Sequence, residues 1–253
     1  MLAEARIQNP ATDVAPERLQ RYQAELAERG WTLVEPRDVA DGVRSLLAHF
    51  GRVIPQLDGQ ETFEVTLKPG FGNLPYSQSK NGIGPHTEAP VYDPPPRYLV
   101  LHCHKQAQCG GGHTQLADGL AFFNALPAEL QLWATRNPVR FTATAQPGQP
   151  AQQQIERPML THQDGQPLFR FSYNQFNYGD VNPSAADIAN PLQHHTETPL
   201  HQIAAAGEAF FIAQAVPVLI PEGHVLIWDN WRLMHARSQY QDPARHLTRY
   251  WLA

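Results

Sequence analysis

The tripeptide His-Thr-Glu occurs twice in this sequence, at residues 86–88 and again at 195–197. Histidine nitrogens and carboxylate oxygens both bind transition metals, so either copy could supply two ligands of a metal site. On a β-strand, residues i and i+2 point to the same face and can converge on one ion. On a helix they lie about 200° apart and diverge. The chemistry therefore depends on which copy lies in an extended segment.

The flanking residues favour the first copy. The second copy runs directly into Thr198 and Pro199, which we expect to begin a helix, because Thr caps helices well and Pro suits the first helical position. We therefore interpret the second copy as solvated polar residues ahead of that cap. The first copy follows a glycine-rich loop (70–85) and precedes an apolar strand (97–104). This context fits a strand end that faces a cavity.

A third ligand would complete a set of two histidines and one carboxylate. Such a set occupies one face of an ion, leaves adjacent positions open, and is typical of non-haem Fe(II) oxygenases. Our candidate is His235, which follows an expected strand (224–229) after a short turn. A metalloprotease would instead carry His-Glu-x-x-His on a helix, a pattern that this sequence lacks. Taken alone, His235 fits a hydrogen-bonded histidine at a strand end better than a metal ligand.

Many short β-prone segments must position these side chains. The 23 prolines favour short strands joined by turns over a helical bundle. We expect a mainly β fold, a barrel or jelly roll with helical additions, in a single domain spanning 1–253. The expected strands are 31–35, 62–69, 97–104, 139–145, 158–162, 167–174, 216–220, 224–229 and 246–253, and the expected helices are 16–30, 38–51, 120–126, 128–136 and 198–215.

Composition narrows the range of partners. The net charge is −5 and the basic residues are scattered, so no basic stripe indicates nucleic acid or an anionic membrane surface. No apolar run approaches the roughly 18–20 residues that cross a bilayer, and we see no export signal. Cys103 and Cys109 fit two free thiols in a reducing compartment. We expect a cytoplasmic protein with a small-molecule partner, and the sequence leaves the oligomeric state open.

The segment 223–252, "GHVLIWDNWRLMHARSQYQDPARHLTRYWL", resembles the closing segment of the taurine dioxygenase-like (TauD/TfdA) family of Fe(II)/2-oxoglutarate oxygenases. In that family a strand, an Asp-Asn pair and an Arg-x-x-His run are followed by an Arg-x-x-x-Arg pair. The matching residues here are Asp229, Asn230, Arg232, His235, Arg245 and Arg249. "HTEAPVYDPPPRYLVLHC" and "GGGHTQLADG" are similar to the family's first metal motif and the strand after it. The resemblance runs from about residue 70 onward, and the N-terminal segment carries little of it.

The resemblance implies a double-stranded β-helix and assigns the metal ligands. His86, Glu88 and His235 would bind Fe(II). The co-substrate 2-oxoglutarate would chelate the ion, and O2 would take the last position. Oxidative decarboxylation would then release succinate and CO2 and oxidise a C–H bond of a substrate held nearby. Glu88 argues against the family's halogenases, in which a small residue replaces the carboxylate.

The resemblance also assigns the groups that bind anions. Arg245, assisted by the Thr114 hydroxyl, would bind the far carboxylate of 2-oxoglutarate, because arginine is always charged and can bind a carboxylate with two donors. Arg249 would be free to bind an anionic group of the substrate. Ser79 and Asn81, in the loop expected to lie over the iron, could bind the substrate's ammonium or carboxylate.

The His-x-Glu variant resembles the clavaminate synthase and asparagine oxygenase branch, whose members oxidise amino acids or their derivatives. We therefore expect a small amino-acid-like substrate that is hydroxylated, desaturated or cyclised. The loop 146–154 is a candidate lid, and His102 and His104 are candidates for core or near-metal positions. Two alternatives stay open: a non-catalytic β-barrel binding protein, and a zinc-dependent hydrolase that uses the same ligands.

Overall fold

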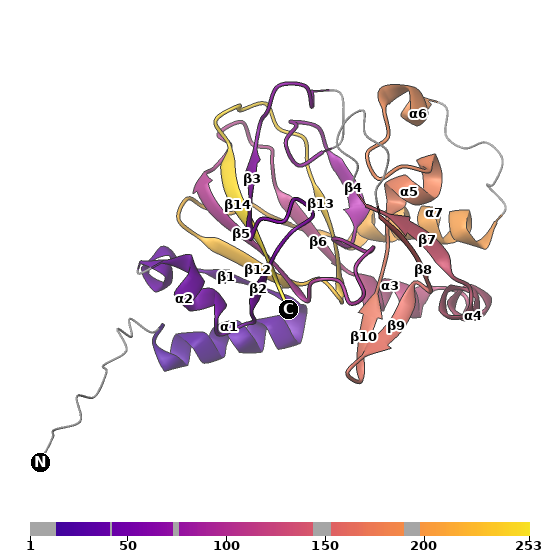
Figure 1. Ribbon diagram of the computed structural model, residues 1–253, viewed down its shortest axis with the longest axis horizontal. Coiled ribbons are helices and arrows are strands. Elements are labelled where there is room, and N and C mark those ends of the chain that lie inside the picture. Colours follow the sequence, from indigo (N-terminus) through magenta and orange to yellow (C-terminus); the bar gives the residue numbers. More distant parts are fainter. Residues whose placement is uncertain (1–13, 41, 73–75, 144–152, 190–197) are drawn as a thin grey trace, which may run out of the picture.

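Two antiparallel sheets face each other at the centre of the protein (Figure 1). The computed structural model describes residues 14–40, 42–72, 76–143, 153–189 and 198–253. The larger sheet contains β1 (Trp31–Val34), β12 (Val225–Asp229), β5 (Tyr98–Lys105), β14 (His246–Leu252), β2 (Val53–Ile54) and β3 (Thr62–Thr66). The smaller sheet contains β11 (Val216–Val218), β6 (Thr114–Asp118), β13 (Leu233–Arg237) and β4 (Ile83–His86). Neighbouring strands are distant in sequence, as in a double-stranded β-helix, so the predicted fold class is confirmed.

The N-terminal helices cover the outer face of the larger sheet (Figure 1). They are α1 (Pro16–Arg29), the short 3-10 helix η1 (Pro36–Val39) and α2 (Val43–Leu47). Their apolar side chains, such as Tyr22 and Leu46, pack against Val100 and Val225 of the sheet. Because this packing occupies only part of the outer face, the polar end of the sheet stays exposed.

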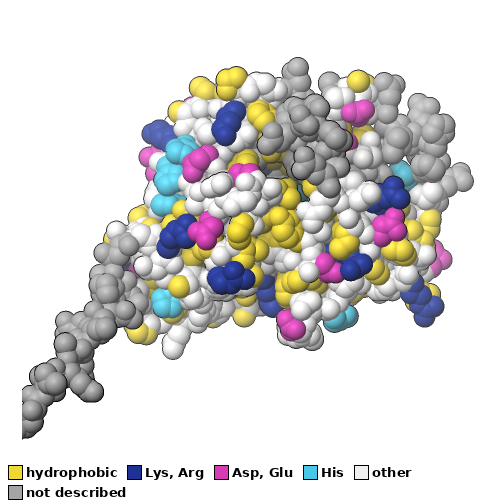
Figure 2. Space-filling model, viewed as in Figure 1, with side chains coloured by type: hydrophobic (Ala, Val, Ile, Leu, Met, Phe, Trp, Pro, Cys, Tyr) yellow, Lys and Arg dark blue, Asp and Glu magenta, His cyan; other side chains and the backbone are white. Residues whose placement is uncertain are grey.

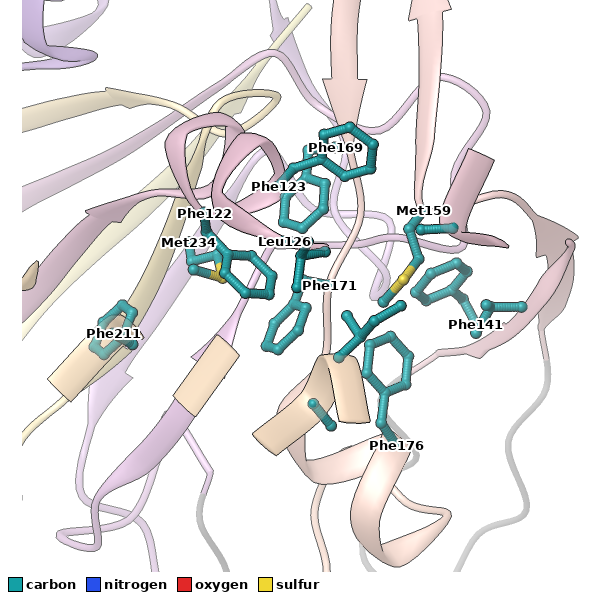
Figure 3. Close-up of a cluster of buried hydrophobic side chains, with 14 of the residues drawn as sticks. Phe122, Phe123, Leu126, Phe141, Met159, Phe169, Phe171, Phe176, Phe211 and Met234 are labelled. Carbon is teal, nitrogen blue, oxygen red and sulfur yellow. The ribbon is translucent and has the colours of Figure 1, made fainter. Parts of the chain in front are cut away.

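A second group of elements covers the outer face of the smaller sheet. It comprises α3 (Gly119–Ala125), α4 (Ala128–Arg136), β7 (Val139–Thr142), β8 (Gln154–Arg157), β9 (Leu160–Gln163), β10 (Gln166–Phe169), α5 (Tyr173–Tyr178), α6 (Ala185–Ala189) and α7 (Pro199–Gln214). Their aromatic side chains meet in one phenylalanine-rich cluster that includes Phe171 and Phe176, and in it Phe122 lies beside Met234 of β13 (Figure 3). Since neighbouring strand residues point to opposite faces, burying Met234 outside the sheet directs His235 inward.

Most expected elements are confirmed, and two are wrong. The expected strand 167–174 ends at Phe169, and α5 begins at Tyr173, so that Phe171 before the helix and Phe176 within it both join the cluster. The expected helix 38–51 is interrupted at Gly42, whose φ of 110° does not belong to a helix. The second His-Thr-Glu copy and most of the candidate lid lie outside the described residues. None of the described helices is long and apolar enough to span a membrane.

Candidate active site

Three candidate metal ligands converge between the two sheets. His86, the last residue of β4, lies directly opposite His235 of β13 in the antiparallel register. Glu88 lies two residues beyond β4, so it approaches from the bend that follows the strand. Its Oε2 lies 3.6 Å from the Nε2 atom of His86 and 3.6 Å from that of His235. The three potential ligand atoms all lie within 4.8 Å of one another.

Backbone contacts orient two of these side chains. The His86 Nδ1 lies 2.9 Å from the carbonyl oxygen of Gly84, which favours a proton on Nδ1 and leaves the Nε2 lone pair for a metal. The buried amide of Asn230 holds the backbone of Glu88 on both sides. Its Oδ1 accepts from the Glu88 N–H at 2.7 Å, and its Nδ2 donates to the Glu88 carbonyl at 3.1 Å. Asn230, five residues ahead of His235, thus fixes the backbone of Glu88.

The charge states of this group suit a cation. Burial alone would raise the pKa of Glu88, but the Arg249 charge and hydrogen bonds from both histidines outweigh it and hold the pKa well below its usual range. Burial, and then the neighbouring His86, lower the pKa of His235 to about 4. Ionised carboxylate and neutral imidazole are the forms that bind metals. Atoms bound at right angles about 2.1 Å from an ion lie about 3 Å apart, so these three could hold one after small inward shifts.

A cavity of about 760 Å³ opens beside this group, within the usual size range of small-molecule sites. Apolar side chains of the larger sheet, including Leu99, Leu101 and Trp228, form much of its wall. Thr114 and Arg245 also line it. The expected co-substrate residues and the expected metal ligands therefore share one cavity.

Arg245 is buried with unused hydrogen-bonding capacity. It is 2% exposed, and its Nη2 donates to the Gly112 carbonyl at 3.3 Å. Its Nε and Nη1 have no hydrogen-bond partner among the described residues. Gly112, at a φ of +79°, makes this approach possible, because a Cβ there would lie 3.0 Å from the Arg245 Nε. A buried charge with unpaired donors is costly, and a bound anion would satisfy it.

Arg237 adds a second buried positive charge. The Tyr240 ring lies 5.2 Å from its guanidinium carbon and 5.1 Å from that of Arg245. Burial, followed by the nearby Arg245, lowers the pKa of Arg237 to about 9, so it stays protonated at neutral pH. Within the described part of the chain, neither arginine forms an ion pair with a carboxylate. This end of the cavity therefore carries excess positive charge that suits an anion.

Arg249 is not free, contrary to expectation. Its Nη1 lies 2.7 Å from the Glu88 Oε1, and its Nε donates to the Gln56 Oε1 at 2.8 Å. It still lines the cavity, beside the candidate metal ligands rather than beside Arg245. In the structure, Arg249 therefore forms an ion pair with a proposed metal ligand.

Ser79 and Asn81 do not line the cavity as expected. The Ser79 hydroxyl is turned into its own loop, where it donates to the Tyr76 carbonyl at 2.9 Å, and the Asn81 Nδ2 donates to the Gly72 carbonyl at 2.9 Å. Arg237 holds the loop from beneath through the Tyr76, Ser77 and Asn81 carbonyls. The loop presents Tyr76, Ser77 and Gln78 to the cavity instead.

The sequence alone assigns no role to three residues that contact this site, namely Gln56, Asn230 and Arg237. Asn230 belongs to the Asp-Asn pair of the family motif, which gives it no function by itself. Arg237 is a basic residue two positions after His235, with no other signal in the sequence. Gln56 has no local signal, since its partner Arg249 is distant in the chain. His102 and His104 were assigned to the core or the metal surroundings. Neither is among the cavity residues, and both contact polar groups on the outer face of the larger sheet.

Solved structures of similar fold include two oxygenases with bound ligands. Asparagine oxygenase in complex with Fe(II), hydroxyasparagine and succinate superposes with a TM-score of 0.71 at 15% identity, covering 93% of this chain and 79% of that one. The non-heme iron oxygenase OrfP in complex with Fe and alpha-ketoglutaric acid superposes with a TM-score of 0.65 at 19% identity. This match covers 94% of this chain and 80% of that one. At these identities the likeness shows the fold.

Sequence comparison gives a curated relative and a family. Human gamma-butyrobetaine dioxygenase is 24% identical over 193 residues, which are 74% of this chain and 47% of the relative. The chain thus spans about half the length of the curated relatives it matches. The model of the family described as taurine catabolism dioxygenase TauD, TfdA family matches residues 23–251. The chain therefore belongs to this family of Fe(II)- and 2-oxoglutarate-dependent dioxygenases.

Proposed function

We propose that the cavity binds Fe(II) through His86, Glu88 and His235 and oxidises a small polar amino acid or a close derivative. The observation that carries the proposal is the placement of two complementary features in one cavity. A convergent histidine–carboxylate group lies at one side, and a buried arginine with unpaired donors lies at the other. A ligand that chelates a metal and also carries a distant carboxylate, as 2-oxoglutarate does, would satisfy both.

The protein's part in this chemistry is binding and orientation. When bound, the iron and 2-oxoglutarate supply the oxidising chemistry, with succinate and CO2 as products. Arg245 binds the far carboxylate with two donors, and the buried Thr114 hydroxyl, which also lines the cavity, assists it. Arg237 adds positive charge behind them. The apolar wall excludes water and fixes where the substrate can lie.

The rim of the cavity supports a zwitterionic substrate. Asp58 and Lys68 line it and provide one charge of each sign, and Gln78 and Asn174 add amide groups. Such a rim can bind an ammonium and a carboxylate in one small molecule. Arg249 can still donate to a substrate carboxylate from its remaining amino group while it contacts Glu88. The ligand named in the asparagine oxygenase structure, hydroxyasparagine, belongs to the same chemical class.

The test is a succinate-release screen across free amino acids and simple derivatives with Fe(II) and 2-oxoglutarate. We expect one or more polar amino acids to stimulate succinate release above the uncoupled rate, with an oxidised product that mass spectrometry detects. The Glu88→Ala variant is the control and should release none. Stimulation by a sulfonate or an aryl-oxy acid and by no amino acid would reject the substrate class and keep the Fe(II) chemistry.

A further inference from the structure

A chain of polar contacts runs from the N-terminal segment to Glu88. Gln56, in the turn after β2, accepts a hydrogen bond from the Arg249 Nε at 2.8 Å and donates its Nε2 to the Arg249 carbonyl at 3.0 Å. Arg249 in turn places its Nη1 2.7 Å from the Glu88 Oε1. Gln56 thus holds both the guanidinium and the backbone of Arg249, and Arg249 holds one oxygen of Glu88.

The surroundings leave this chain little freedom. The guanidinium carbon of Arg249 lies 4.7 Å from the Phe63 ring centroid and 5.3 Å from that of Trp251. Gln56 is 3% exposed, and its backbone N–H and carbonyl are both bonded within the turn that carries it, to Gln60 at 2.8 Å and Gly59 at 2.9 Å. A different Gln56 rotamer would leave buried donors and acceptors unpaired, which costs about 1–3 kcal/mol for each group.

The two oxygens of Glu88 consequently have different partners. Oε2 faces the Nε2 atoms of both histidines at 3.6 Å, whereas Oε1 faces Arg249. A carboxylate can bind a metal through one oxygen or through both, and the second mode occupies an additional coordination position. An oxygen engaged in a short, charge-assisted hydrogen bond is held away from that second mode.

We propose that Gln56 is a positioning residue that, through Arg249, keeps Glu88 a one-oxygen ligand. This inference rests on the proposed function, because it requires that Glu88 binds the metal. Three single-atom protein ligands leave three positions on a six-coordinate ion. The keto acid takes two of them, so a second Glu88 oxygen would remove the position that O2 requires. A residue of the N-terminal segment, 193 positions from Arg249 in the sequence, then sets how many positions stay open.

The test measures open positions rather than turnover. Purified full-length protein is loaded anaerobically with Fe(II) and 2-oxoglutarate, and nitric oxide serves as the probe of the last position, read by electron paramagnetic resonance. The variant is Gln56→Leu, which keeps the approximate size of the side chain and removes both contacts with Arg249. Gln106→Leu is the matched control, since Gln106 is another buried glutamine but neither lines the cavity nor contacts Arg249. Gln56→Glu keeps the acceptor for the Arg249 Nε.

We expect Gln56→Leu to bind Fe(II) within about threefold of the unchanged protein but nitric oxide about tenfold more weakly, about the smallest loss of activity usual when a residue behind a metal ligand is changed. Gln106→Leu and Gln56→Glu should bind nitric oxide normally. Normal nitric oxide binding by Gln56→Leu would overturn the inference. If that variant does not fold, Arg249→Lys replaces it, because one ammonium cannot bridge Glu88 and Gln56 together. Failure of the proposed function is separately visible, since Glu88→Ala would then retain Fe(II).

Discussion

Two groups of histidine and glutamate side chains lie on opposite faces of the β-structure. The inner group is His86, Glu88 and His235, between the two sheets. The outer group lies on the uncovered face of β3, β5 and β14, where histidine side chains gather at the surface (Figure 2). Its members are His102, His104, His246 and Glu64, with Thr248 between them.

The two groups share residue types and antiparallel strands, but not their physical state. In the outer group, the His246 Nε2 lies 2.5 Å from the Glu64 Oε2, and His246 is 44% exposed, so its members are bonded to one another and solvated. In the inner group, Glu88 and His235 are 13% and 12% exposed, and the His235 Nδ1 has no partner among the described residues. The inner group also borders a cavity. Unmet bonding capacity beside open space, rather than residue type, distinguishes the candidate site.

The largest effect should come from deleting one member of each group in parallel. His86→Ala, Glu88→Ala or His235→Ala should reduce 2-oxoglutarate turnover to background, because each removes a proposed metal ligand, while the fold remains intact by circular dichroism. The matched outer variant His246→Ala should keep Fe(II) binding within about twofold, as surface substitutions usually perturb little. Anaerobic Fe(II) titration measures both. Loss of Fe(II) binding in His246→Ala, with normal binding in the inner variants, would reverse the assignment. His195→Ala, in the second His-Thr-Glu copy, should also leave Fe(II) binding nearly unchanged.

A second effect, of intermediate size, compares two buried arginines. Arg245 has donors without hydrogen-bond partners among the described residues, whereas Arg170 is hydrogen-bonded to Thr161 and Asp93. Arg245→Ala should raise the apparent requirement for 2-oxoglutarate far more than that for the prime substrate. Truncating one partner of a buried charge pair costs about 2–5 kcal/mol, or about 30- to 5,000-fold. Steady-state kinetics with each substrate varied in turn measures the split.

The control is Arg170, which is equally buried but donates to Thr161 and Asp93 at 3.0 Å each. Arg170→Ala should lower the melting temperature, since the Asp93 Oδ1 and the carbonyls of Pro90 and Tyr92 lose its donors, and should not selectively change 2-oxoglutarate dependence. An Arg245→Ala protein with ordinary 2-oxoglutarate dependence would move the co-substrate role to Arg249.

The smallest effect concerns pH and the outer group. Burial, then the nearby His104, lower the pKa of His102 below 6.5, and burial, then His246, lower that of His104. The unfolded chain therefore binds more protons than the folded one just below pH 6.5, so these groups reduce stability as the pH falls through that range. His104→Gln should flatten the fall of the melting temperature between about pH 6.5 and pH 5. An unchanged slope would show that the outer histidines do not interact in this way.

Sequence reasoning predicted the residue types of the site better than their positions in the fold. His86 and His235 were paired as ligands by motif, yet His235 was placed after a strand, whereas it lies on β13 opposite His86. Only the sheet register, which depends on contacts between distant segments, reveals that pairing. The strand–helix error at 167–174 has a similar origin, because the phenylalanine cluster, not local propensity, decides where β10 ends.

The remaining site residues were beyond sequence reasoning for a different reason. Ser79 and Asn81 are small polar residues in a loop near the metal motif, and nothing local indicates that Arg237 engages this loop from below. Gln56 lies 193 positions from Arg249. Such contacts have no sequence spacing to detect, because the chain brings them together only through β2 and β14.

The position of β14 affects the order in which the site can form during synthesis. This strand pairs with β5, β3 and β2, and it and the residue before it supply Arg249 and Arg245. These arginines leave the ribosome more than 150 residues after Glu88, roughly 8 to 30 seconds later at ordinary elongation rates. Until then the growing chain holds His86 and Glu88 without Arg249, which contacts the Glu88 carboxylate, and without Arg245, the proposed anchor of the keto acid. A ribosome-bound chain can thus expose two of the three proposed metal ligands, and the proposed site is complete only when β14 has joined the larger sheet.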